Sequence, residues 1–144
     1  MIATRKVFFD TWGWLAIAHR DDRRHSEAAA FYREYIVSGG IPVTSDYILA
    51  ETISLLRART TPKGTENFID GLLAAQNNNR IVVERISEER WQTAWKLSKK
   101  FADKPDISFA DFTSFVVMKE VRISEALTAD RHYEMIGMGF SKLL

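Results

Sequence analysis

Residues 6–11 read Lys-Val-Phe-Phe-Asp-Thr, and this stretch decides the fold class. Consecutive apolar residues that end in a carboxylate are typical of a short buried strand, because strands of parallel sheets are covered on both faces. A related pattern returns at residues 126–130, which read Ala-Leu-Thr-Ala-Asp. We therefore predict strands at 6–9 and 126–128, each followed by an acidic side chain.

Outward from these two strands, extended and helical patterns alternate along the chain. Apolar residues recur at helical spacing, most clearly between Ile48 and Leu56, and Gly, Pro or Asn mark several of the breaks. Further strands are predicted at 41–44, 81–85 and 140–143, and helices at 11–19, 25–37, 46–59, 63–76, 87–101, 108–121 and 131–136. Such alternation favours parallel βαβ units. The expected fold class is α/β, with a small, mostly parallel sheet of four to five strands flanked by helices.

Length and composition narrow the possible classes of protein. The 144 residues suit one domain, 1–144, and an apolar share of 46% with nine Phe and four Trp allows a substantial core. The 20 basic and 19 acidic residues nearly cancel, which neither favours nor excludes a nucleic-acid partner. The absence of cysteine excludes disulfides, thiolate metal sites and cysteine nucleophiles. With no apolar run near the ~20 residues of a membrane span, and no signal peptide, we expect a cytoplasmic protein without a membrane partner.

Four acidic residues fall where an α/β fold of this kind would bring them together. Asp10 and Asp130 follow predicted strands, and Glu51 and Asp111 lie early in two helical patterns. Ligand chemistry in open parallel sheets sits at the carboxyl ends of the strands. Carboxylates gathered there would repel one another by about 4 kcal/mol per close pair at an effective dielectric near 20. A divalent cation is the natural counter-charge, so the pattern predicts a metal-dependent enzyme.

Each acid also has a structural alternative. Asp10 and Asp130 could cap the helices that follow them. Asp111 stands three residues after Ser108, which is the spacing of a capping box. Glu51 could share the buried face of its helix or lie on the surface.

Other motifs point to packing. The three histidines show no paired spacing, so no zinc site is predicted, and His132 fits a pattern of helix packing. Trp91 and Trp95 lie four residues apart on one helix face, which favours burial in the core or in a subunit interface. Trp12 and Trp14 are expected to pack under the sheet, with Trp12 near enough to touch the cleft. P-loop, serine-hydrolase and dinucleotide-binding motifs are missing from the sequence.

Five segments together resemble a known family. They read Val-Phe-Phe-Asp-Thr at 7–11, His-Ser-Glu-Ala at 25–28, Thr-Ser-Asp-Tyr-Ile-Leu-Ala-Glu-Thr at 44–52, Ser-Phe-Ala-Asp-Phe-Thr-Ser-Phe-Val-Val-Met at 108–118 and Leu-Thr-Ala-Asp-Arg-His-Tyr at 127–133. In this order and spacing the chain resembles PIN-domain proteins, specifically the VapC-type toxin nucleases of bacteria and archaea. The resemblance implies a three-layer sandwich fold.

The same resemblance implies residue roles. Asp10, Glu51, Asp111 and Asp130 match the acidic cluster that binds Mg²⁺ or Mn²⁺ and hydrolyses RNA. Asp106 matches a frequent extra acid, and Thr11 and Thr128 match hydroxyl positions beside the cluster; Thr128 could orient Asp130 or a water. The implied partners are an RNA substrate, a small antitoxin protein that fills the cleft, and a second copy in a homodimer.

Two positions depart from the family pattern. Trp12 replaces a small Ser or Asn, and Ala129 replaces an aromatic residue, which bears on rate and substrate shape rather than on the acids themselves. Basic side chains near predicted helix ends are the candidates for RNA contacts: Arg20, Arg23, Arg24, Arg57, Arg59, Lys104 and Arg131.

Two other functions remain open at this point. One is a non-catalytic RNA-binding or scaffolding PIN-like module, and the other is a housekeeping RNA-processing nuclease that has no antitoxin.

Overall fold

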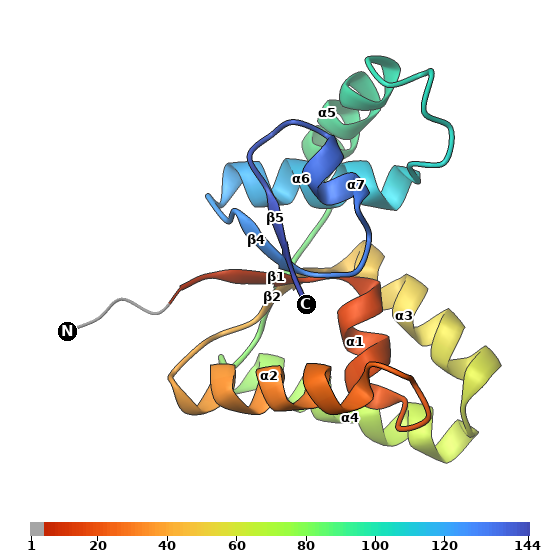
Figure 1. Ribbon diagram of the computed structural model, residues 1–144, viewed down its shortest axis with the longest axis vertical. Coiled ribbons are helices and arrows are strands. Elements are labelled where there is room, and N and C mark those ends of the chain that lie inside the picture. The colour runs from red at the N-terminus through yellow and green to blue at the C-terminus, as the bar shows by residue number, and fades with distance from the viewer. Residues whose placement is uncertain (1–4) are drawn as a thin grey trace.

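The centre of the molecule is one sheet of five parallel strands (Figure 1). The computed structural model describes residues 5–144. The strands lie in the order β3-β2-β1-β4-β5. Their bounds are β1 Val7–Phe9, β2 Val43–Ser45, β3 Val82–Glu84, β4 Glu125–Leu127 and β5 Ser141–Leu143. The α/β class and the predicted parallel sheet are confirmed.

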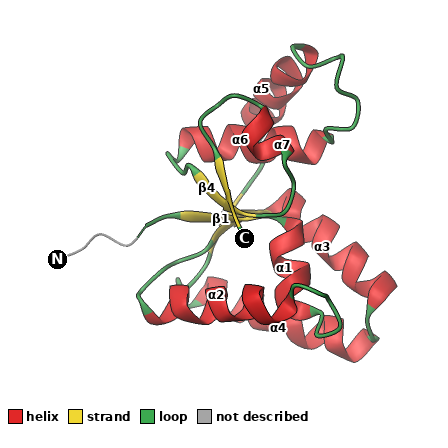
Figure 2. Cartoon of the chain, in the orientation of Figure 1, coloured by secondary structure: helices red, strands yellow, loops and turns green. Residues whose placement is uncertain are grey.

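Helices cover both faces of this sheet and complete a three-layer sandwich (Figure 2). In Figure 1, four of them lie below the sheet: α1 Thr11–Ala18, α2 His25–Val37, α3 Asp46–Arg59 and α4 Pro62–Asn77. Three lie above it: α5 Glu88–Lys99, α6 Phe109–Glu120 and α7 His132–Met135. No helix among residues 5–144 has the length and apolar character needed to cross a membrane.

Every predicted element is present, and the boundaries differ by at most two residues. The differences have local causes. Helix α4 starts at Pro62 rather than Lys63, because proline lacks the N–H that the first helical turn leaves unpaired, and the Thr61 hydroxyl caps the turn by accepting from Gly64 N–H at 3.0 Å. The Ser45 hydroxyl caps α3 in the same way, by accepting from Ile48 N–H at 3.2 Å.

Strand β1 lies fully inside the core, with all three of its residues inaccessible to solvent. Trp14 packs beneath it, 4.8 Å from Phe9 between ring centroids, and its indole N–H donates to the Thr44 hydroxyl at 3.2 Å. The expected packing of Trp14 under the sheet is therefore confirmed.

The strand order reverses between β1 and β4. From β1 the chain adds β2 and then β3 on one side, and it later places β4 and β5 on the other. Such a reversal opens a crevice at the carboxyl ends of the two central strands, where α/β proteins bind ligands. Asp10 directly follows β1, and Asp130 follows β4 by three residues.

Helix α1 approaches β4 closely at a glycine. A Cβ atom added to Gly13 would lie 2.7 Å from the Leu127 carbonyl oxygen and 3.0 Å from the Leu127 side chain. The Leu127 backbone is held in the sheet and cannot move away freely, so only glycine, which has no Cβ atom, permits this approach.

We expect Gly13→Ala to lower the free energy of unfolding by about 1–3 kcal/mol, because overpacking against the Leu127 backbone outweighs the gain in helix propensity. Thermal unfolding followed by circular dichroism measures this change. The matched control is Gly71→Ala on α4, where an added Cβ meets nothing within 4 Å. A Gly13→Ala variant as stable as the control would contradict the close-packing explanation.

Candidate active site at the carboxyl ends of the strands

A buried threonine links the ends of the two central strands. The Thr128 hydroxyl donates to Asp10 Oδ2 at 2.7 Å and accepts from the Asp130 backbone N–H at 3.0 Å. The Asp10 backbone N–H in turn donates to the Leu127 carbonyl at 3.3 Å. One hydroxyl thereby fixes both the carboxylate that follows β1 and the segment that carries the acid after β4.

Asp111 comes to the same place from the first turn of α6. Its carboxylate accepts from the Ser108 backbone N–H at 3.2 Å, and its own N–H donates to the Ser108 hydroxyl at 3.1 Å, so the capping box is complete. The same side chain is close enough to Asp10 and Asp130 that their negative charges raise its pKa. Asp111 therefore caps its helix and belongs to the acidic cluster at once.

Burial and repulsion leave two of these acids with unusual proton affinities. The pKa of Asp10 is raised to about 6, chiefly because burial removes the charged form from water, although the Thr128 hydrogen bond lowers it in part. The pKa of Asp111 is raised to about 7 by burial first and then by Asp10 and Asp130. Carboxyls held this far from their ordinary range mark a candidate functional site.

His132 joins the cluster, contrary to the prediction that it only packs a helix. Its Nδ1 lies 2.8 Å from Asp130 Oδ1 and its Nε2 lies 2.9 Å from Asp106 Oδ2. The contact with His132 is the main reason that the pKa of Asp106 is held below its usual range. Prediction from the sequence missed this role; its only signal there is the position of His132 two residues after Asp130.

The acids predicted for the site do not all meet. Asp111, Asp130 and His132 each place one potential ligand atom within 4.8 Å of the others, and Asp10 is tied to Asp130 through Thr128. Glu51 lies exposed on α3, and among residues 5–144 its carboxylate makes no hydrogen bond or ion pair. Its place in the site stays a prediction.

Asp10 does not cap helix α1, which was the structural alternative for this residue. Its side chain makes no capping hydrogen bond to α1 and is instead directed to Thr128. Asp130 accepts from the His132 backbone N–H at 2.9 Å, and this shapes the turn into α7.

The residues around the cluster fit a hard cation. Within the described chain, no Lys or Arg forms an ion pair with Asp10, Asp111 or Asp130. The Thr11 hydroxyl is buried next to Asp10 and has no hydrogen-bond partner among residues 5–144. The buried Tyr133 hydroxyl lies close enough to Asp10 to lower the pKa of that carboxyl in part. Carboxylates without a Lys or Arg partner suit a hydrated Mg²⁺ or Mn²⁺, because both ions prefer oxygen ligands and Mg²⁺ usually keeps several waters.

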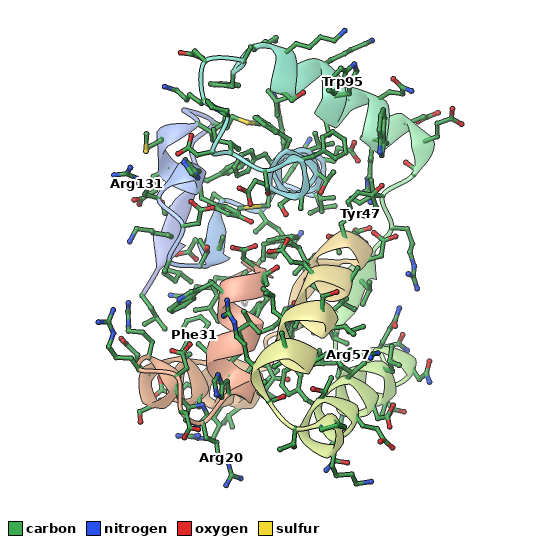
Figure 3. All side chains as sticks on the ribbon, turned by 90° about the vertical axis from the view of Figure 1, so that its right-hand side faces the viewer. Arg20, Phe31, Tyr47, Arg57, Trp95 and Arg131 are labelled. Carbon is green, nitrogen blue, oxygen red and sulfur yellow. The ribbon has the colours of Figure 1, made fainter. Side chains whose placement is uncertain are left out.

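The basic side chains predicted to contact RNA are spread widely. Figure 3 looks onto the face where the strands end, and it shows Arg131 and Arg57 on opposite sides of that face with Arg20 at its lower edge. Arg20, Arg23, Arg57 and Arg131 are exposed. Arg24 is already engaged, since it pairs with Glu27 and lies over the Trp12 ring at 5.3 Å.

The tryptophan pair on α5 is not part of the core of this chain. Trp91 and Trp95 stack 6.5 Å apart between centroids and retain 38% and 46% of their surface exposed. Of the two predicted placements, core burial is therefore wrong, and burial in a subunit interface stays a prediction.

The comparisons with known proteins agree with this geometry. The family model of the PIN domain matches residues 7–137. The chain belongs to the PIN domain family. It is 28% identical over 131 residues to the 23S rRNA-specific endonuclease VapC20 of Mycobacterium tuberculosis, covering 91% of this chain and 94% of that relative.

Two solved structures resemble the chain. The crystal structure of Mycobacterium tuberculosis VapC20, a sarcin–ricin loop cleaving toxin, matches with a TM-score of 0.76 at 26% identity, over 92% of this chain and 95% of that one. VapBC2 of Rickettsia felis, bound to a DNA fragment of its promoter, matches with a TM-score of 0.68 over 95% and 96% of the two chains. At 12% identity, the second likeness shows the fold alone.

The raised pKa values of Asp10 and Asp111 give a pH dependence of stability. Each carboxyl binds its proton more tightly in the folded protein than in the unfolded chain, so the folded state carries more protons between about pH 4 and pH 7. Stability from these two groups is therefore gained as the pH falls through this window and lost as it rises. In EDTA we expect the melting temperature at pH 5 to exceed that at pH 8 by roughly 5 °C.

The control is Asp10→Asn combined with Asp111→Asn, which removes both titrations with little change of shape. Scanning calorimetry of both proteins at the two pH values gives the comparison. The double variant should lose most of the difference, and an unchanged difference would show that other groups cause it.

Proposed function

We propose that this protein is a Mg²⁺- or Mn²⁺-dependent endoribonuclease. The proposal is supported above all by the meeting of Asp10, Asp111 and Asp130 at the strand-order reversal, unpaired with any Lys or Arg of the described chain. A divalent ion bound there would lower the pKa of a water and neutralise charge on the oxygens of the scissile phosphate.

The residues of the chain divide the remaining tasks. Asp10, Asp111 and Asp130 would hold the ion, in part through water. Thr128 fixes one oxygen of Asp10 through its hydroxyl, so the other oxygen keeps a defined direction. Arg131, exposed and adjacent to Asp130, is the best placed of the basic residues to contact a phosphate of the RNA backbone.

The nature of the substrate is inferred from the relatives. VapC20 is a 23S rRNA-specific endonuclease, and we extend the RNA substrate to this chain. We further infer a toxin of a toxin–antitoxin pair that acts as a homodimer and is restrained by a small antitoxin protein. The departures at Trp12 and Ala129 leave the three clustered acids intact, so they bear on substrate choice rather than on the reaction type.

Asp10→Asn and Asp111→Asn should each lower RNA cleavage by at least about 100-fold, because each variant removes a charge that the ion requires. Cleavage of ribosomal RNA and of structured RNA oligonucleotides in Mn²⁺, resolved on denaturing gels, is the measurement. Circular dichroism checks that both variants keep the fold. Induced expression in bacteria adds a cellular reading, in which the wild type alone should arrest growth.

Equal cleavage by wild type and both variants would exclude this site as the source of the activity. A wild type that binds RNA but neither cleaves it nor binds Mn²⁺ would favour a non-catalytic module. Cleavage without growth arrest would favour a housekeeping nuclease.

Glu51→Gln tests the acid that the structure leaves exposed on α3. The family resemblance predicts a loss of cleavage of about tenfold or more with an unchanged melting temperature, because an exposed side chain contributes little to stability. The matched control is Glu89→Gln, an equally exposed glutamate on α5. Cleavage by Glu51→Gln at the control's rate would remove Glu51 from the predicted site.

A further inference from the structure

A single imidazole bridges two carboxylates that come from separate parts of the chain. His132 contacts Asp130, which follows β4, and Asp106, which lies 26 residues earlier in the segment 100–108 between α5 and α6. The His132 side chain is 14% exposed, while that of Asp106 is 65% exposed. The bridge therefore runs from a mostly buried ring to a carboxylate on the surface.

The contact on the Asp130 side fixes the orientation of that carboxylate. Asp130 Oδ1 lies 2.9 Å from the His132 backbone N and 2.8 Å from Nδ1. Both contacts fall on the same oxygen, and within residues 5–144 Oδ2 of Asp130 accepts no hydrogen bond. A carboxylate held by one oxygen presents the other as a ligand in a fixed direction.

The contact on the Asp106 side holds the segment 100–108 against the site. Inside this segment the backbone forms only local turns, in which Lys104 N–H donates to Phe101 O and Ile107 N–H donates to Lys104 O. Ile107 is anchored in the core, but Asp106 has no side-chain partner other than His132 among the described residues. The segment leads directly into Ser108 and the first turn of α6, which carries Asp111.

We propose that His132 is a positioning residue with two separable tasks: Nδ1 orients Asp130 toward the bound cation, and Nε2 pins Asp106 and the segment 100–108 beside the site. His132 acts through the two carboxylates and is not itself a ligand, because each of its nitrogens already lies within 2.9 Å of a carboxylate oxygen. This inference rests on the proposed metal-dependent function.

Two substitutions separate the tasks. His132→Asn keeps an amide N–H near the place of Nδ1 and removes the reach to Asp106. His132→Gln keeps an amide N–H near the place of Nε2 and removes the side-chain contact with Asp130. His132→Ala removes both, and Asp106→Ala removes the surface partner alone. Neither readout requires catalysis: Mn²⁺ affinity is measured by calorimetry, and amide hydrogen exchange of residues 100–108 is measured by mass spectrometry on the metal-free protein.

The variants should separate the two measurements, with one group defective in Mn²⁺ binding alone and the other in amide exchange alone. His132→Gln should bind Mn²⁺ at least about tenfold more weakly, as loss of an outer partner of a ligand does, and should keep wild-type exchange in the segment 100–108. His132→Asn and Asp106→Ala should bind Mn²⁺ with an affinity within about threefold of wild type, a much smaller change than the one expected for His132→Gln. In both variants the amides of residues 100–108 should exchange faster than in the wild type. His132→Ala should show both defects.

Other outcomes overturn the inference. If both readouts decline together in all His132 variants, the ring has only a general structural role. If His132→Asn binds Mn²⁺ as weakly as His132→Ala, the ring is a direct ligand. If His132→Gln binds Mn²⁺ as tightly as the wild type, the inference about His132 is wrong but the proposed function stands. If the wild type binds no Mn²⁺, both the inference and the proposed metal-dependent function are wrong.

Discussion

The hydrogen bond from Thr128 to Asp10 is the interaction on which the site depends. It joins the two central strands at the point where the strand order reverses, and its hydroxyl also receives the Asp130 N–H. A threonine at the end of a buried strand can offer both a donor and an acceptor without bringing in a charge. The geometry of the acids after β1 and β4 therefore follows from sheet pairing rather than from flexible loops.

The fold could be predicted from the sequence because its signals are local and agree with one another. A dense apolar run marks β1, and Ala126 and Leu127 are the buried residues of β4. Ser45, Ser87 and Ser108 each cap the helix that follows them. The site was predictable in part for the same reason, since acids that follow parallel strands meet at one edge. His132 was not predictable in this way, because its partner Asp106 lies 26 residues earlier, in the segment between α5 and α6, and meets it only in the folded structure.

Glu51 illustrates a different limit. Helical periodicity places Glu51 near Ile48 and Leu55, yet Ile48 is buried and Glu51 is exposed. Three residues advance a helix by only about five-sixths of a turn, so Glu51 falls beside the narrow buried stripe of α3 rather than on it. The pattern of one helix cannot say which side faces a cleft formed by other elements.

For Asp111 the two explanations offered by the sequence were not exclusive, because one carboxylate caps α6 with one hydrogen bond and still faces its neighbours.

The cluster opposes folding in the absence of a counter-charge, and this constrains how the protein can work. Asp10 is 6% exposed and its pKa is raised to about 6, so near neutral pH the folded protein keeps a mostly charged group out of water. Packing of the apolar core must compensate for the cost of burying this charge. A ligand that binds only the folded state would shift the folding equilibrium toward the folded protein by mass action. Binding of the proposed cation would then be linked to folding through the same three carboxylates. Any partner that occupies the cleft with a basic side chain would act on the same balance, because Asp10, Asp111 and Asp130 have no Lys or Arg partner within the described chain.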